Sequence, residues 1–157
     1  MLERCAAQII WVGRRALDGN IESRLDALSE LGPRPVYISA DAGDRAALAN
    51  VRDDILSRFG RLDGIVHSAL VLRDKSLARM SRDELDASLA PKVAVSRALA
   101  QVFDGDALDF VLLFSSMMSF VTAAGQANYA AGCAFKDAFA AALRRDWNCA
   151  VKVINWG

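Results

Sequence analysis

The sequence predicts an α/β fold in which helices on both faces cover a doubly wound, parallel β-sheet. Two observations carry this prediction: 54% of the 157 residues are hydrophobic, and short apolar runs alternate along the chain with longer helical patterns. Apolar runs of this kind are typical of buried parallel strands. The alternation of strands and helices favours parallel pairing with right-handed crossovers. The length fits one domain over residues 1–157.

Five apolar runs are expected to form the strands, and each has the length of a buried strand. They cover residues 8–12, 35–39, 64–68, 110–115 and 151–155. Parallel sheets bind ligands at the carboxyl ends of their strands, so the polar residues that follow these runs are the candidates for function. These residues are Arg14, Arg15, Asp41, Ser68, Ser115, Ser116 and Asn155.

The segments between the runs are expected to be helices, and several carry start signals. Two of them cover residues 20–31 and 126–145. Asp44 is expected to cap a helix that runs to residue 59, and Ser81 with Glu84 has the spacing of a capping box. Pro91 is expected to begin a further helix, because proline suits the first helical turn.

Charge and cysteine content exclude several classes of function. Lys+Arg and Asp+Glu are both 19, so the net charge is zero. No basic patch predicts nucleic-acid binding, and the apolar runs are far shorter than the roughly 20 residues of a membrane helix. Three cysteines form no CxxC motif, and with a single histidine no metal site is expected. A cytoplasmic, reducing environment is the simplest interpretation.

A longer pattern is more specific than any of these signals. The stretch FSSMMSFVTAAGQANYAAGCAF (114–135) is accompanied, in order along the chain, by four others. These are VGRR (12–15), DGIVHSALVLRD (63–74), LAPKV (89–93) and VINWG (153–157). Together they resemble the ketoreductase domains of modular polyketide synthases, a branch of the short-chain dehydrogenase/reductase superfamily with a Rossmann-like fold. NYAAGCAFKDAFA and VKVINWG look most like ketoreductases of synthases that lack built-in acyltransferases.

The resemblance implies an activity and partners. The family uses NADPH to reduce a β-ketoacyl chain to a β-hydroxyacyl chain, which hangs on the phosphopantetheine arm of an acyl carrier protein beside other domains of the same synthase. The family's spacings select Tyr129, Ser116 and Lys92 as catalytic residues. The phenol would donate a proton, the ammonium would lower the pKa of the phenol, and the serine would hydrogen-bond the developing oxyanion. Without the resemblance, a solvated helix face is the default for Lys92.

The same resemblance implies cofactor contacts after the strands. It assigns this role to Arg14, Arg15, Asp41, Ser68, Ala69 and Asn155. The two arginines would meet the adenosine 2′-phosphate and so favour NADPH, or they are simply an exposed loop pair. Asp41 would face the adenine, or it caps a turn. His67 is expected to be a buried strand histidine rather than a catalyst.

Stereochemistry follows from the LRD stretch. Leu72 and Asp74 match the LxD pattern of B-type ketoreductases, whose product is the D-configured alcohol. Val121 stands where the A-type has tryptophan, and no proline closely follows Tyr129, as it does in epimerising variants. Asp74 could otherwise be only a loop carboxylate.

Three departures from the family favour an alternative. Cys133 replaces the common asparagine four residues after the tyrosine, either as a subgroup variant or as a packing residue, because a thiol is a poor hydrogen-bonding partner. Leu70 stands where glycine is common. The glycine-rich phosphate loop and the first strand are missing, which predicts a fragment truncated at both ends with two unpaired sheet edges.

The alternative is therefore a redox-silent ketoreductase-like domain that serves as a scaffold between the domains of a synthase. A free-standing reductase of the same superfamily ranks below it. Classical members place the catalytic lysine four residues after the tyrosine, which is the position of Cys133.

Overall fold

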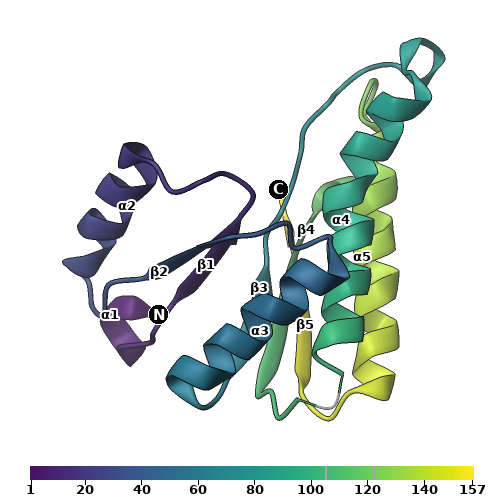
Figure 1. Ribbon diagram of the computed structural model, residues 1–157. Helices are drawn as coiled ribbons and strands as arrows, with labels where there is room; N and C mark the ends of the chain where they lie inside the picture. The colour runs from purple at the N-terminus through teal and green to yellow at the C-terminus, as the bar shows by residue number, and fades with distance from the viewer. Residues whose placement is uncertain (105, 122) are drawn as a thin grey trace.

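The computed structural model describes residues 1–104, 106–121 and 123–157 (Figure 1). Its five strands are β1 (Ile10–Gly13), β2 (Val36–Ser39), β3 (Gly64–His67), β4 (Phe110–Ser116) and β5 (Ala150–Trp156). All five expected strands are confirmed, each with boundaries within two residues of the prediction. Every pairing is parallel: β1 pairs with β2, β3 pairs with β4, and β4 pairs with β5.

The strands form two sheets, one of two strands and one of three. Within the described part of the chain, one edge of β1 and one edge of β3 therefore have no partner strand. The ribbon shows the β1–β2 pair standing apart from β3, β4 and β5 (Figure 1). Two open edges are what the sequence predicts for a parallel sheet without its central strand.

The helices follow the start signals in the sequence, with one exception. They are α1 (Leu2–Cys5), α2 (Gly19–Ser29), α3 (Arg45–Phe59), α4 (Arg82–Val102) and α5 (Ala127–Asp146), with short 3₁₀ turns at Leu77–Arg79 and Met117–Ser119. The Asp44 side chain caps α3 by accepting from the Ala47 N–H at 2.9 Å. Ser81 and Glu84 form both hydrogen bonds of the capping box that opens α4.

The exception is Pro91, which was expected to begin a separate helix. It lies inside α4, which runs without interruption from Arg82 to Val102. A proline inside a helix removes one backbone hydrogen bond. Packing of α4 against α3 and α5 carries the helix through this position, because tertiary contacts outweigh local propensity.

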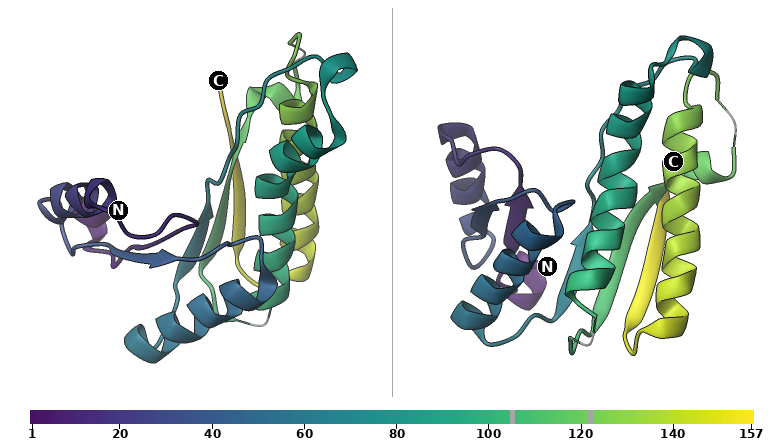
Figure 2. Two further views of the ribbon diagram at one scale, coloured as in Figure 1. Left: turned by 45° about the horizontal axis from the view of Figure 1, so that its top comes forward. Right: turned by 45° about the vertical axis from the view of Figure 1, so that its right-hand side comes forward.

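The core lies between the three-stranded sheet and helices α3, α4 and α5, which cover one of its faces (Figures 1 and 2). Along β4, buried residues alternate with half-buried ones, as the pleat of a strand requires. The buried cluster comprises Leu48, Val95, Ala98, Leu99, Phe103, Leu108, Val111, Leu113, Ala140, Leu143 and Val151. On the other face of the sheet, the rings of Phe114 and Trp156 stack at 5.8 Å.

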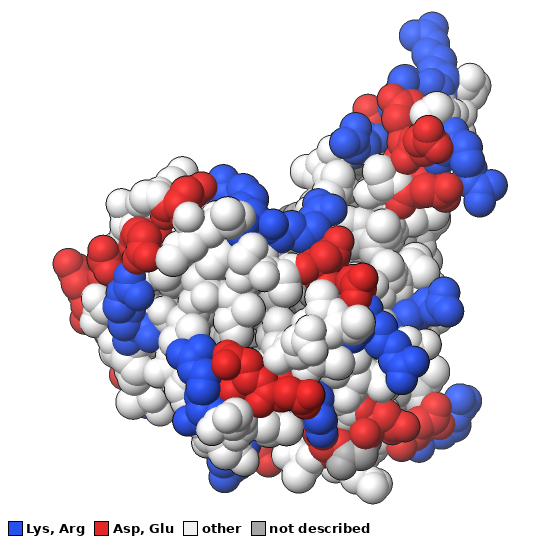
Figure 3. Space-filling view, viewed as in Figure 1, with Lys and Arg blue, Asp and Glu red and all other residues white. Residues whose placement is uncertain are grey.

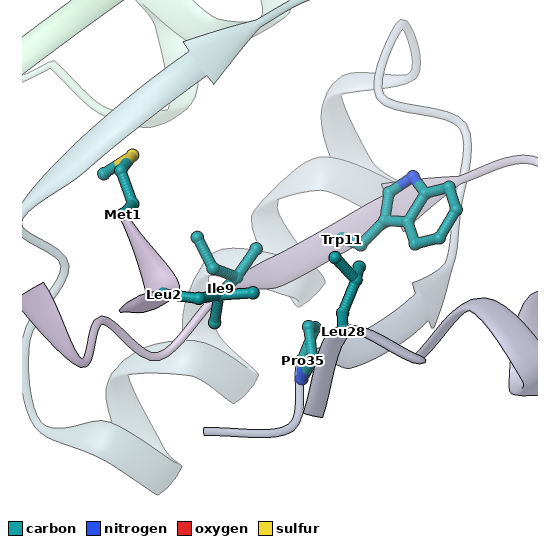
Figure 4. Close-up of a pocket in the computed structure, with 6 residues that line it drawn as sticks. All are labelled: Met1, Leu2, Ile9, Trp11, Leu28 and Pro35. Atoms are coloured by element: carbon teal, nitrogen blue, oxygen red, sulfur yellow. The ribbon is translucent and has the colours of Figure 1, made fainter. Parts of the chain in front are cut away.

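The β1–β2 pair is flanked by α1 and α2 and buries less. Ile21 and Leu25 of α2 are buried, and the Trp11 and Tyr37 rings meet edge to face, with their centroids 5.7 Å apart. An apolar hollow of about 310 Å³ opens here, lined by residues of α1, β1, α2 and the β2 approach (Figure 4). Its lining consists of Met1, Leu2, Ile9, Trp11, Leu28 and Pro35.

Charged side chains of both signs are interspersed over the face drawn in Figure 3. No described helix is both long enough and apolar enough to span a membrane.

Candidate active site

Three side chains with reactive or polar groups meet where β4 ends and α5 begins. Tyr129 lies in the first turn of α5, and Ser116 is the last residue of β4. Lys92 projects from the middle of α4, and its Nζ lies 3.8 Å from the centroid of the Tyr129 ring. The Ser116 side chain lies close enough to the Tyr129 hydroxyl to lower the pKa of the phenol. The structure thus brings together the three residues that the sequence predicts as catalytic.

Lys92 is buried rather than solvated, so the default reading of this lysine is wrong. Its side chain is only 2% exposed, and its ammonium has no hydrogen-bond partner among the described residues. Burial lowers the pKa of Lys92, because removal from water disfavours the charged form. Gly132 of α5 makes room for it, since a Cβ at this position would lie 2.6 Å from the Lys92 Cδ.

The phenol of Tyr129 has a raised pKa, with burial as the largest cause. The neighbouring Ser116 side chain lowers the pKa, and the nearby Cys133 and Asp74 raise it further. In this structure, burial outweighs any lowering of the phenol pKa by the Lys92 ammonium. The ammonium lies over the ring face, where it makes a cation–π contact, and desolvation of the phenolate dominates.

Cys133 lies one helical turn after Tyr129 and is completely buried. Its backbone carbonyl accepts a hydrogen bond from the Ser115 hydroxyl at 3.3 Å. Ser115 thus satisfies a buried backbone group at the end of β4, which is the ordinary role of a serine at this place. The burial of the thiol agrees with the packing interpretation of Cys133.

Asn155 of β5 belongs to the frame around Ser116. Its side-chain nitrogen lies 3.2 Å from the Ser116 carbonyl oxygen, 2.9 Å from the Ser119 hydroxyl and 2.9 Å from Asp137 Oδ2. All three atoms can accept its hydrogen bonds. The amide that the resemblance assigns to the cofactor is thus engaged with protein atoms, and it fixes the end of β4 against β5.

The LRD stretch is tied to the start of α5. The Gln126 side chain donates to Asp74 Oδ2 at 2.8 Å, and the Asn128 side chain donates to the Arg73 carbonyl oxygen at 3.1 Å. Leu72, by contrast, is 61% exposed. Asp74 is therefore more than a free loop carboxylate, because its hydrogen-bond partner Gln126 lies three residues before Tyr129. Sequence analysis missed Gln126 and Asn128, although both lie inside the GQANY stretch.

The residues expected at the adenosine end lie after β1 and β2, on the smaller sheet. Arg14 and Arg15 are exposed, and the Arg15 carbonyl accepts from the Tyr37 hydroxyl at 2.7 Å. Asp41 Oδ1 accepts from the Gly43 N–H at 2.8 Å. The turn-capping alternative for Asp41 therefore describes what its side chain does here.

The segment after β3 is open to solvent, whereas the last residue of that strand is not. Ser68, Ala69 and Leu70 are all exposed. His67 is 3% exposed, and burial together with the nearby Lys136 ammonium lowers its pKa to about 3. The expected buried strand histidine is confirmed. Within the described ranges, no group of three His, Cys, Asp or Glu side chains could hold a metal ion.

Sequence analysis also missed Lys136, the most deeply buried charged residue. Its side chain is 1% exposed, and its Nζ donates to the carbonyl oxygens of Phe114 at 2.8 Å and His67 at 3.3 Å. Burial lowers the pKa of Lys136 to about 8, with a further contribution from repulsion by Lys92. Its position seven residues after Tyr129, two turns along the same helix face, is the signal that could have revealed it.

Comparison with known proteins extends this picture. The KR domain family matches residues 1–157, which is the whole chain. The chain is 47% identical over 157 residues to polyketide synthase PksM and 49% identical over 156 residues to polyketide synthase PksN, both of Bacillus subtilis (strain 168). These alignments cover 100% and 99% of this chain but only 4% and 3% of the relatives.

Solved structures agree with the family match. An N-terminal ketoreductase from the macrolactin assembly line superposes with a TM-score of 0.90 and 28% identity, over 95% of this chain and 31% of that one. A short-chain dehydrogenase from Burkholderia cenocepacia J2315 in complex with NADP shares the fold, with a TM-score of 0.75 and 23% identity over 94% of this chain and 62% of that one. From the match over its full length and the identity to two polyketide synthases, the chain belongs to the KR domain family of polyketide synthase ketoreductases.

Proposed function

We propose that the chain is the catalytic part of a B-type ketoreductase, which uses NADPH to reduce a β-ketoacyl chain on an acyl carrier protein to a D-configured β-hydroxyacyl chain. The observation that carries this proposal is the meeting of Lys92, Ser116 and Tyr129 at the end of β4. Residues 1–157 form one partial domain in this proposal. The partners are the carrier protein and the other domains of a cytoplasmic synthase that lacks built-in acyltransferases.

The residues fit a nicotinamide cofactor at two points. Arg14 and Arg15 present two exposed cations after β1, which suits a phosphate group. The buried Lys92 ammonium has no partner in the described structure, and a hydroxyl or carbonyl oxygen of a bound molecule would satisfy it. Ser68 and Ala69 are exposed after β3, and Asp41 is exposed after β2. When bound, NADPH would supply the hydride that reaches the carbonyl carbon.

The protein groups handle the carbonyl oxygen. The Ser116 hydroxyl donates a hydrogen bond to the oxygen as negative charge grows on it. The Tyr129 hydroxyl gives its proton to the same oxygen and becomes a phenolate. Because burial raises the pKa of Tyr129, this phenolate needs the neighbouring Lys92 cation for its stabilisation. Leu72 and Asp74, the latter bonded to Gln126, set which face of the ketone is presented.

The test of this proposal is the replacement Tyr129→Phe, which removes the proton donor and little else. We expect kcat for a β-ketoacyl thioester to fall at least a hundredfold, while the dissociation constant of NADPH stays within threefold. The chain has only one other tyrosine, so Tyr37→Phe is a matched control that should retain kcat. Turnover by Tyr129→Phe equal to that of the unmodified protein would refute the assignment.

A second candidate function is a redox-silent scaffold within a synthase. It is favoured by Cys133, whose buried thiol replaces the asparagine expected from the family. Reduction should be measured with this chain and with a longer polypeptide that carries flanking ketoreductase segments at both ends. Turnover by the longer polypeptide supports the reductase. A folded longer polypeptide that binds NADPH but reduces no β-ketoacyl thioester points to Cys133, and one that binds no NADPH supports the scaffold.

A further inference from the structure

The end of β3 leaves two buried backbone carbonyls to be satisfied. The β3–β4 pairing stops at His67, which lies opposite Leu113, whereas β4 continues to Ser116 and from there on pairs only with β5. The carbonyl oxygens of His67 and Phe114 both accept from the ammonium of Lys136. The lysine therefore supplies the donors at the point where the ladder between the two strands ends.

The burial of the Lys136 ammonium costs free energy, so its position calls for a compensating role. Burial of an ammonium in an apolar interior is unfavourable unless hydrogen bonds compensate for the lost water. The groups that face Lys136 come from three elements: His67 on β3, Lys92 on α4, and Cys133 with Asp137 on α5. A second cation, Lys92, opposes the charge, so Coulomb attraction alone does not explain a lysine here.

The neighbouring residue of α5 extends the contact to the third strand. Asp137 Oδ2 lies 2.9 Å from the side-chain nitrogen of Asn155 on β5, and the same nitrogen lies 3.2 Å from the Ser116 carbonyl oxygen. Two consecutive residues of α5 thus bond the carboxyl ends of β3, β4 and β5. Tyr129 lies on the same helix, two turns before Lys136.

We propose that Lys136, supported by Asp137, is a positioning residue for ketone reduction. It holds the ends of β3 and β4 together, and so sets the spacing between the segment after β3, Ser116 and the tyrosine carried by α5. The proposal rests on the proposed reductase function. It assigns Lys136 no contact with substrate or cofactor. Its role is to act through the backbone that carries Ser116.

The first test is Lys136→Met, which keeps the length of the side chain and removes its donors. We expect kcat for a β-ketoacyl thioester with NADPH to fall at least tenfold while KM stays within threefold, because the reacting groups are misplaced but the substrate still binds. Asp137→Ala, at a half-buried position, should lower kcat in the same selective way by a smaller factor. Leu143→Ala is the control, since Leu143 is buried on the same helix but bonds none of the strand ends.

The outcomes separate positioning from plain stability. A loss of kcat in both Lys136→Met and Asp137→Ala, with kcat retained in Leu143→Ala under conditions where all are folded, supports the proposal. Unchanged kcat in Lys136→Met, or an equal loss in Leu143→Ala, overturns it.

A second measurement is independent of turnover. In Lys136→Met, amide hydrogen exchange at Ser115 and Ser116 should be faster than in the unmodified protein. This increase should be at least tenfold larger than the increase at Val111, which is in the same strand but away from its end. If neither the unmodified protein nor the longer polypeptide reduces a thioester, the proposed function fails, and this exchange ratio still decides whether Lys136 holds the strand ends. Equal exchange in both proteins would overturn the contact itself.

Discussion

The two sheets of this molecule differ in how they are packed and in what they carry. The three-stranded sheet lies under α3, α4 and α5, and every member of the main buried cluster comes from residue 48 onward. The β1–β2 pair has the short helices α1 and α2 beside it (Figure 2), with an open apolar hollow between them. The proposed catalytic residues lie on the first region and the proposed adenosine contacts on the second.

This difference teaches where the molecule needs precision. A reaction between groups a few ångströms apart depends on side chains locked by a dense core. Lys92 is held by burial, Lys136 is held by burial and by hydrogen bonds to strand ends, and Tyr129 is half-buried in the first turn of α5. Recognition of a phosphate by exposed cations, the role proposed for Arg14 and Arg15, tolerates a looser support.

The largest effect should come from two matched truncations, one in each region. Leu113 on β4 and Leu25 on α2 are both 1% exposed, so each Leu→Ala change removes the same buried atoms. Leu113→Ala should lower the free energy of unfolding of the three-stranded region by about 4 kcal/mol, because a cavity forms in a dense core. Leu25→Ala should cost about 2 kcal/mol, because the hollow lined by Leu28, three residues further along α2, gives this region room to relax. Equal losses of unfolding free energy, measured by chemical denaturation, would show that the two regions are packed equally well.

A pH dependence of stability should come from Lys136. The folded chain releases this proton near pH 8, since burial lowers the pKa to about 8 from 10.5. Between these values the unfolded chain binds more protons, so the free energy of unfolding of the native chain should rise with pH, by roughly 3 kcal/mol in total. Denaturation curves for the native chain and for Lys136→Met, measured at several pH values, check this. A difference between them that does not change with pH contradicts the prediction.

A smaller effect should follow from Gly132→Ala, which tests how tightly the three-stranded region is packed around Lys92. The added Cβ would lie 2.6 Å from the Lys92 Cδ, so the lysine must move. We expect a loss of about 2 kcal/mol from overpacking and a shift of the Lys92 ammonium away from the Tyr129 ring. Gly19→Ala is the control, because nothing lies within 4 Å of a Cβ there. Thermal unfolding of both variants measures the difference, and equal melting temperatures would contradict it.

The secondary structure was largely predictable because its signals are local. Strands showed as apolar runs, and the caps at Asp44 and Ser81 depend on side chains within three residues. The prediction that Pro91 begins a helix was wrong because the packing of α4 depends on residues far away in the sequence. The convergence of Ser116 and Tyr129 came from family resemblance, since residues thirteen positions apart in different elements have no local signature.

The rest of the site could not be predicted from residue type. A lysine side chain is expected to be in contact with water, so the burial of Lys92 and of Lys136 did not follow from their residue type. The raised pKa of Tyr129 did not follow from the sequence either, because it depends on desolvation, which only the folded structure reveals.

The single histidine has a practical consequence for spectroscopy. His67 is the only imidazole in the chain, and with a pKa of about 3 it stays neutral above about pH 5. Its ring should give one set of NMR signals, and no protonation of the ring itself should shift these signals at higher pH. Its carbonyl accepts from Lys136, and its pKa responds to that ammonium. The chain therefore carries its own spectroscopic reporter, which requires no label or mutation, for the protonation of the lysine beneath the candidate active site.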